Sequence, residues 1–313
     1  MADNSSYELI NTLPSPEEFI SALGNWAYVL YICSGLISLI LLAQYLVIVC
    51  KISIPAERYG PTVWVNSVYA IAAMMCTVAI VLPRAGPYIS SVFKIFIGIA
   101  MVKFVELLLI SVGGEHRILA NFNELTYINL KSPPFCFCIC CPTGVHMTQK
   151  KLSAMKYSVY QVIFFFIGKL KNTFTVVLQM PFVQFLCIFT VDLLGKAEYS
   201  SSDDFSLTDE NVYLQTGMTM SFFVAMWGLF QLMSITMKFE LVGDCKFKFK
   251  AVLLKVLIVV INVQGMVIDV LIYYEVFGCF RQLGPKAVGG MVRDVTLMIE
   301  AFFLGNLSFY LHF

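Results

Sequence analysis

The chain alternates long apolar stretches with short polar ones, and six of the apolar stretches are long enough to form membrane-spanning helices. A bilayer core about 30 Å thick needs about 20 apolar residues per helix. Helices suit this environment because lipid offers no hydrogen-bond partners for unpaired backbone groups. The pattern therefore predicts spans at Trp26–Cys50, Thr62–Leu82, Tyr88–Val112, Leu214–Met237, Ala251–Tyr274 and Val292–Phe313.

A seventh apolar stretch, residues 157–194, is too long for a single span and carries Lys169 and Lys171 near its centre. We place the fourth span at Val176–Leu194 and treat Lys156–Phe174 as a helix that lies at the membrane interface or is partly re-entrant. The expected fold class is therefore all-α, a polytopic membrane protein with seven transmembrane helices.

This arrangement divides the chain into two parts. Residues 1–25 form an extracellular N-terminal segment, and residues 26–313 form the seven-helix transmembrane domain. Residues 113–156, between the third and fourth spans, form a cytosolic loop rich in cysteine. No soluble domain is expected.

Composition supports a membrane protein. Hydrophobic residues make up 59% of the chain and charged residues 13%, and the mean hydropathy is +0.80. Soluble domains carry roughly 25% charged residues, so a soluble fold of this length could not cover its surface with polar groups. The net charge of +1 also provides no long-range field to hold nucleic acid. A cytosolic enzyme, a disordered chain and a nucleic-acid-binding protein are thus excluded.

Basic residues predict the orientation. The first 25 residues contain four acids and no Lys or Arg, unlike a cleavable signal peptide. With the N-terminus outside and the C-terminus cytosolic, the cytosolic loops carry eleven Lys and Arg residues against five in the outer segments. The inner basic residues then face anionic lipid head groups. Asn4 begins an Asn-Ser-Ser glycosylation sequon on the predicted outer side.

Residue constellations typical of catalysis are missing from the sequence. The three histidines, His116, His146 and His312, are scattered and have no metal-ligand spacing. There is no Gly-rich phosphate loop and no Gly-x-Ser-x-Gly elbow. We therefore predict no catalytic residues, no metal site and no cofactor, and do not expect an enzyme.

The sharpest local feature is a cysteine cluster in Pro133–Pro142, formed by Cys136, Cys138, Cys140 and Cys141. A reducing cytosol disfavours disulfides there, and zinc sites usually need two Cys-x2-Cys pairs separated by a longer loop. Cysteines beside a membrane and between apolar residues favour S-acylation, which would anchor the loop. Metal binding and a purely structural role remain open.

Charged residues inside predicted spans are a second feature. A charge at the bilayer centre costs at least about 2.5 kcal/mol on insertion scales, so such residues tend to face protein or water. Lys103 and Glu106 are three residues apart on one face of the third span, and Glu300 lies in the last. They could form a structural ion pair, or a polar path for an anionic or amphipathic substrate. Gln264 in the sixth span could border that path, although a hydrogen bond between helices is the simpler interpretation.

Four motifs occur in an order that resembles the alpha subunit of the organic solute transporter, a family related to the transmembrane protein 184 proteins. They are Gly113-Gly114-Glu115, the cysteine cluster ending in Pro142, Gln264, and Ile299-Glu300-Ala301-Phe302. Each motif is short, but together they extend from about Trp26 to the end of the chain. The segment Met180-Pro181-Phe182-Val183-Gln184 favours the transporter branch.

The resemblance implies a function that composition does not show. Members of the family are facilitative, sodium-independent carriers of bile acids, steroid sulfates and similar amphipathic organic anions. They work with a single-span beta subunit and carry a lipid-acylated cysteine cluster. By position, the acylated residues here would be Cys136, Cys138, Cys140 and Cys141. The expected location is the plasma membrane, with the endoplasmic reticulum and endosomes as alternatives.

One departure from the family pattern and two alternative functions remain. Residues 162–176 lengthen the fourth-span region by about 15 residues over the pattern expected by resemblance to the family, so they could be an insertion. A non-transporting scaffold or trafficking protein of the transmembrane protein 184 type fits the same sequence. A seven-helix receptor is disfavoured, because the third span has no Asp-Arg-Tyr-like ending and the last has no Asn-Pro-x-x-Tyr motif.

Overall fold

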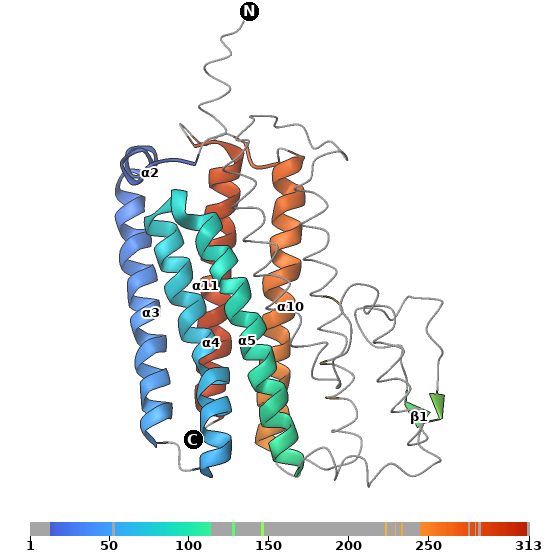
Figure 1. Ribbon diagram of the computed structural model, residues 1–313. Helices are drawn as coiled ribbons and strands as arrows, with labels where there is room; N and C mark the ends of the chain where they lie inside the picture. The colour runs from blue at the N-terminus through green and yellow to red at the C-terminus, as the bar shows by residue number, and fades with distance from the viewer. Residues whose placement is uncertain are drawn as a thin grey trace, which may run out of the picture. The chain divides into compact units, whose positions relative to one another are not determined.

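The computed structural model is built mainly from helices, in agreement with the all-α prediction (Figure 1). Two strands of two residues each complete the described secondary structure. The structure describes residues 13–51, 54–113, 127–128, 145–146, 223, 229, 233, 245–274, 276–278, 280 and 283–311.

The chain divides into two compact units. The first comprises Met1–Pro55, Val63–Phe93 and Cys245–Phe313, and the second comprises Ala56–Thr62 and Lys94–Asp244. Each unit is described separately below.

A short helix, α2 (Pro16–Leu23), precedes the first span, where the sequence predicts only an extracellular segment. Ser15 caps its N-terminus: the Glu18 N–H donates to the Ser15 hydroxyl, and the Ser15 N–H donates to the Glu18 carboxylate at 2.7 Å. This reciprocal capping box stabilises a helix that would otherwise be too short to persist. At its C-terminus, Gly24 adopts φ 61°, a conformation that few other residues adopt readily, and the chain turns directly into the next helix.

Helix α2 is held against the first unit by apolar packing. Phe19, Ala22 and Leu23 bury their side chains in one cluster with Ala27 of the next helix. Leu283 and Ala287, which lie more than 250 residues later in the chain, complete that cluster. Helix α2 is therefore an integral part of the unit.

The first three predicted spans are helices. They are α3 (Asn25–Lys51), α4 (Ala56–Val81) and α5 (Gly86–Val112), with a 3-10 turn, η1 (Pro83–Ala85), between the last two. Helix α4 begins six residues before the predicted start at Thr62. Hydropathy windows miss this first part because it holds Glu57 and Arg58, yet polar residues are good helix formers at a membrane boundary.

The last two predicted spans are also helices, and both begin earlier than their apolar cores. Helix α10 (Cys245–Tyr273) starts six residues before Ala251, and α11 (Pro285–Tyr310) starts seven residues before Val292. Proline is favoured in the first turn of a helix because its missing N–H would have no partner there, and Pro285 begins α11 in this way. Of the predicted fifth span, Phe223, Leu229 and Met233 are described, all helical. The predicted fourth span, Val176–Leu194, lies outside the described residues.

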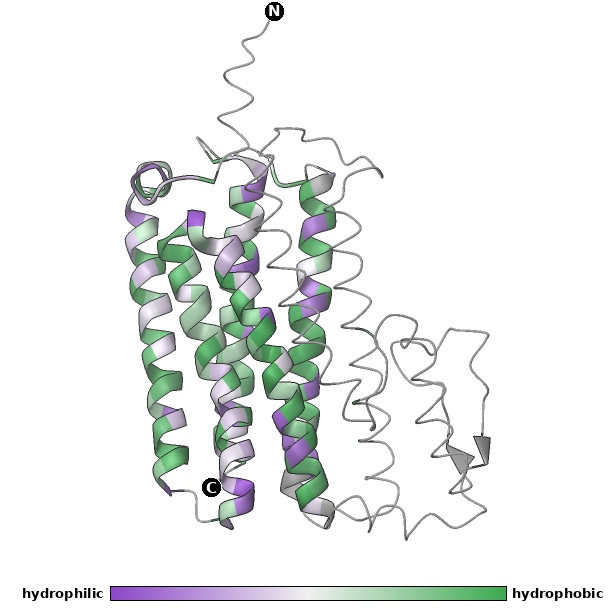
Figure 2. Cartoon of the chain, in the orientation of Figure 1, coloured by the Kyte–Doolittle hydropathy of each residue, from purple (hydrophilic) through white to green (hydrophobic). Residues whose placement is uncertain are grey.

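Within the described part, three helices are long and apolar enough to cross a bilayer. They are α3, α4 and residues 248–272 of α10, with mean hydropathies of 2.4, 1.8 and 2.4. Figure 2 shows hydrophobic residues predominating along them. Helix α11 has 26 residues and carries four charged side chains, as many as residues 248–272 of α10.

Close packing in the first unit depends on small side chains. A Cβ added at Gly305 of α11 would lie 2.6 Å from Leu41 Cδ2 and 3.2 Å from Tyr69 Cβ, so α11 approaches α3 and α4 closely there. Small residues allow such approach between membrane helices. Polar contacts reinforce it: the Ser38 and Thr77 hydroxyls lie 2.7 Å apart.

The two strands lie in the second unit, on either side of the predicted cysteine cluster. β1 (Tyr127–Ile128) pairs antiparallel with β2 (Val145–His146), with Tyr127 opposite His146. Residues 129–144, which lie between the two strands in the sequence, are outside the described residues. The sequence predicts a loop at 113–156 and misses the ladder, because strands of two residues leave no periodic pattern.

Candidate functional site

Helix α11 carries three charged side chains inside the last predicted span, two near its start and one further along. Arg293 and Asp294 are neighbours in its first half, and Glu300 follows two turns later. All three lie within electrostatic range of the buried Cys76 thiol on α4. Charged groups in an apolar bundle are costly unless they are paired or functional, so α11 is the helix around which a site can be built.

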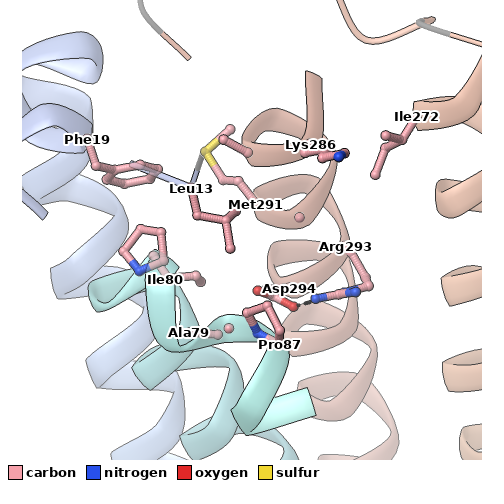
Figure 3. A pocket seen from close by; sticks show the side chains of 14 residues that line it. Leu13, Phe19, Ala79, Ile80, Pro87, Ile272, Lys286, Met291, Arg293 and Asp294 are labelled. Atoms are coloured by element: carbon pink, nitrogen blue, oxygen red, sulfur yellow. Dashed lines mark hydrogen bonds and ion pairs between the residues drawn. The ribbon is translucent and has the colours of Figure 1, made fainter. Parts of the chain in front are cut away.

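A cavity of about 210 Å³, here called the α2 cavity, lies beside the start of α11. Its walls come from the N-terminal segment and α2, the α4–α5 connection, α10 and α11. The lining residues are Leu13, Phe19, Ala79, Ile80, Pro83, Gly86, Pro87, Ile272, Lys286, Ala287, Gly290, Met291, Arg293 and Asp294. Figure 3 shows Lys286, Arg293 and Asp294 on α11 and the apolar residues Phe19 and Ile80 among the other walls.

An ion pair lies at the polar side of the α2 cavity. Arg293 Nε donates to Asp294 Oδ1 at 3.3 Å, and the two side chains are 27% and 13% exposed. The pair uses only one nitrogen of the guanidinium, so the two terminal nitrogens lie outside it. This arrangement neutralises Asp294 and leaves Arg293 with donors for another acceptor.

The N-terminal wall of the α2 cavity is fastened by Arg84 of η1. Arg84 Nε donates to the Leu13 carbonyl at 3.1 Å, and its guanidinium lies 3.6 Å from the Glu18 carboxylate. Hydrogen bonds from Ser15 are the main cause that lowers the pKa of Glu18, and the Arg84 charge adds to it. Both side chains of this ion pair are exposed, at 62% and 58% for Arg84 and Glu18.

Two of the four sequence-predicted path residues lie in the first unit. Gln264 Nε2 donates to the Arg293 carbonyl at a long 3.4 Å, so the hydrogen bond between helices expected for Gln264 is confirmed and joins α10 to α11. Glu300 Oε2 is buried and has no hydrogen-bond partner among the described residues. The side-chain oxygen of Gln44 is likewise buried and has no hydrogen-bond partner among the described residues. The side-chain nitrogen of Gln44 donates to Asn306 Oδ1 at 2.7 Å. Unpaired acceptors are expensive in lipid and are suited to a ligand or water.

The other two, Lys103 and Glu106, form an ion pair on α5 in the second unit. Lys103 Nζ lies 2.8 Å from Glu106 Oε2, as the spacing of three residues predicts. The side chains are 36% and 39% exposed. Lys103 thus pairs with Glu106 on α5, and Gln264 of α10 bonds to α11, which lines the α2 cavity.

The modification sites predicted from the sequence lie outside the described residues. These are Asn4 for glycosylation and Cys136, Cys138, Cys140 and Cys141 for lipidation. Within the described ranges, no three His, Cys, Asp or Glu side chains are grouped as a metal site would require.

The residues that line the cavity with charge were not singled out by the sequence as a site. In the sequence, Arg293 lies at the start of the last predicted span and Lys286 lies shortly before it. One sequence feature could have indicated this site. Three charged residues, Lys286, Arg293 and Asp294, interrupt the apolar pattern in the first half of α11.

Comparison with known proteins gives one consistent result. A family model described as Organic solute transporter Ostalpha matches residues 26–168 and 167–312 of the chain. An organic solute transporter subunit alpha from Danio rerio is 21% identical over 251 residues, covering 80% of this chain and 71% of the relative. One from Leucoraja erinaceus is 22% identical over 271 residues, covering 85% and 71%. No solved structure matches the chain.

The similarity extends along most of the chain and is not confined to the four short motifs. The two matched segments meet at residues 167–168, inside the stretch 162–176 that the sequence analysis treats as a candidate insertion.

Proposed function

Because this chain belongs to the Ostalpha family of organic solute transporters, we propose that it is one subunit of a facilitative, sodium-independent transporter of amphipathic organic anions. Bile acids, steroid sulfates and related conjugates are the proposed substrates. The transporter is completed by a single-span beta-type subunit. The chain is a membrane protein, and the plasma membrane is its proposed location.

One observation carries this proposal: charged side chains of α11 are retained inside an apolar helix bundle and border a cavity. Ionisable side chains are rare in membrane helices, and those that occur often mark an ion or substrate pathway. The Arg293–Asp294 pair lines the α2 cavity, and the Glu300 carboxylate has an unpartnered oxygen further along the same helix. A carrier of anions needs such groups, whereas a scaffold does not.

The proposed topology follows the distribution of basic residues. Seven spans place the N-terminus outside and the C-terminus in the cytosol, with residues 1–25 extracellular, 26–313 forming the transmembrane domain and 113–156 a cytosolic loop. Helix α2 and the α2 cavity then lie at the outer end of the first unit. Asn4 is glycosylated on the same side.

The residues proposed for the substrate path are polar side chains on three helices. Lys103 and Glu106 contribute from α5, Gln264 from α10 and Glu300 from α11. Acylation of Cys136, Cys138, Cys140 and Cys141 anchors the cytosolic loop to the inner leaflet. In the sequence, the four cysteines lie between the paired strands β1 and β2.

Uptake of a labelled steroid sulfate tests the proposal. Cells produce this chain alone, a candidate single-span partner alone, or both, and uptake is measured in sodium-free medium. We expect saturable uptake only with both chains, at a rate that sodium does not change. Surface biotinylation and the glycan at Asn4 measure delivery. Absence of uptake by a pair that reaches the surface would contradict the transporter and favour a scaffold.

A further inference from the structure

The α2 cavity combines apolar walls with a charged patch on one helix. Phe19 from α2, Ile80 from α4 and Met291 from α11 are among its apolar residues. Its charged residues are Lys286, Arg293 and Asp294, all on α11 (Figure 3). An amphipathic ligand with a charged end and an apolar body matches this division.

The charge of the cavity favours one negative group. Two cations and one carboxylate line it, so the charges of the lining side chains sum to +1. Within the Arg293–Asp294 pair, Asp294 is the less exposed side chain, at 13%. Its contact with Arg293 is a single hydrogen bond, donated by Arg293 Nε. The terminal nitrogens of Arg293 are therefore positioned to bind a planar or tetrahedral oxyanion through paired hydrogen bonds.

The size of the cavity limits how much of a ligand it can hold. Pockets that enclose a whole drug-sized molecule measure about 300–1,000 Å³, whereas this cavity measures about 210 Å³. A sulfate, sulfonate or carboxylate with its adjoining carbons fits that volume, but a fused-ring body does not. The remainder of the ligand must then lie outside the cavity.

We propose that the α2 cavity is the subsite for the anionic head of the transported solute, with Arg293 as its counter-ion and Asp294 as the residue that limits the site to monoanions. This inference rests on the proposed function and assigns one of its steps, recognition at the α2 end of the bundle. The apolar walls contact the carbons next to the head group. Lys286 adds a second positive charge to the cavity.

Equilibrium binding to the purified full chain in phosphatidylcholine nanodiscs tests the subsite. The probes are tritiated oestrone sulfate and tritiated oestrone, which share a ring system and differ in the anionic head. Arg293→Gln should weaken oestrone sulfate binding at least tenfold and leave oestrone binding within twofold. Lys248→Gln removes a cation about 36 Å away along α10, measured from Ile272, and should change neither. A merely structural role of Arg293 would weaken both probes equally, which would overturn the proposal.

A glycine pair provides a second test that leaves the charges intact. A Cβ added at Gly290, which lines the α2 cavity, meets no atom within 4 Å, and the same holds at Gly35 of α3 outside it. Gly290→Leu should fill the cavity and weaken oestrone sulfate binding at least fivefold, whereas Gly35→Leu should not. Equal binding by both variants would contradict a head group in the cavity.

A third variant tests the charge limit. Asp294→Asn raises the excess charge in the cavity from one to two, so it should improve binding of oestradiol disulfate relative to oestrone sulfate about fivefold. An unchanged ratio would remove Asp294 from the proposal.

Two outcomes separate the subsite from the transporter itself. Sulfate-selective binding through Arg293 without flux in cells would uphold the subsite and contradict the proposed function. Flux in cells, with no effect of Arg293→Gln on binding, would uphold the proposed function and contradict the subsite. If the purified chain instead retained anionic phospholipid, and Arg293→Gln released it without affecting oestrone sulfate, a lipid head group would be the occupant and the proposal would fail.

Discussion

Two ion pairs on α5 and α11 use the same chemistry in different surroundings. Lys103 and Glu106 are one helical turn apart, 2.8 Å from each other, with side chains more than one third exposed. Arg293 and Asp294 are adjacent in sequence, 3.3 Å apart, and the Asp294 side chain is 13% exposed. Both partners of the first pair lie on one face of α5 and neutralise each other there. The second borders a cavity and leaves guanidinium donors outside the pair.

The comparison shows that the spacing that best forms an ion pair need not mark the pair that binds a ligand. Residues three apart on a helix meet on one face without help from other elements, whereas adjacent residues point about 100° apart around the helix axis. Arg293 and Asp294 therefore meet by turning toward a shared space beside α11. We infer that the pair with the poorer local geometry is the more important one for an anion. The following predictions test that ranking.

The largest effect is expected from exchanging the two charges of the cavity pair. Arg293→Asp combined with Asp294→Arg keeps the net charge and an ion pair but moves the cation by one residue around the helix. We expect initial rates of steroid sulfate uptake to fall at least tenfold at equal surface amount. Uptake within twofold of the original would show that the position of the cation does not matter, against the proposed subsite.

A smaller effect is expected from the same exchange on α5. Lys103→Glu combined with Glu106→Lys preserves a pair at i,i+3 and hence its mutual neutralisation. The cation moves by one turn along the proposed path, so uptake should fall about threefold. The measurement is the same uptake assay, run beside the α11 exchange. An unaltered rate would make Lys103 and Glu106 a purely structural pair.

Removing the link between α10 and α11 should have a modest effect. Gln264→Leu deletes a donor that reaches the Arg293 carbonyl at 3.4 Å, a length at which hydrogen bonds are weak. The KM for steroid sulfate should rise about twofold. Asn262→Leu is the matched control, because Asn262 bonds the Ile258 carbonyl of its own helix. An equal rise in both variants would point to a general disturbance of α10.

The exposed pair of Glu18 and Arg84 should show the smallest effect, visible only in acid. Hydrogen bonds from Ser15, helped by Arg84, lower the pKa of Glu18. A lowered pKa stabilises the folded segment above the ordinary carboxyl pKa of about 4.3, and this contribution is lost as the pH falls through the lowered value. Amide hydrogen exchange of residues 13–25, corrected for intrinsic rates, should therefore rise as the pH falls below about 4. Glu18→Gln cannot titrate and should abolish the pH dependence.

Much of the helical framework could be predicted because hydropathy is a local property. The cores of α3, α5, α10 and α11 coincide with the predicted spans, and the family resemblance drawn from four short motifs is confirmed by the family match. The starts of α10 and α11 could not be predicted this way. A helix continues past its apolar core wherever its polar residues reach water, and apolar windows stop before that point.

The Lys103–Glu106 ion pair could be predicted because both partners lie on one helix, whereas the contacts of α2 with distant parts of the chain could not. The Lys103–Glu106 pair follows from a spacing of three residues, and Gln264 from its polarity inside a span. The docking of α2 does not, because Phe19 meets Leu283 and Ala287 from the other end of the chain. No local pattern encodes such a contact.

By itself, the sequence determined that this protein lies in a membrane, where the apolar cores of α3, α5, α10 and α11 lie, and that the chain belongs to a family of organic solute transporters. Those properties depend on composition, on local periodicity and on motifs in order. Only the tertiary structure decided which charges gather around a space. The α2 cavity is formed by residues from positions 13 to 294, and its volume depends on how their helices pack. Arg293 becomes a candidate ligand-binding residue only after α2, α4 and α10 have closed the other walls around it.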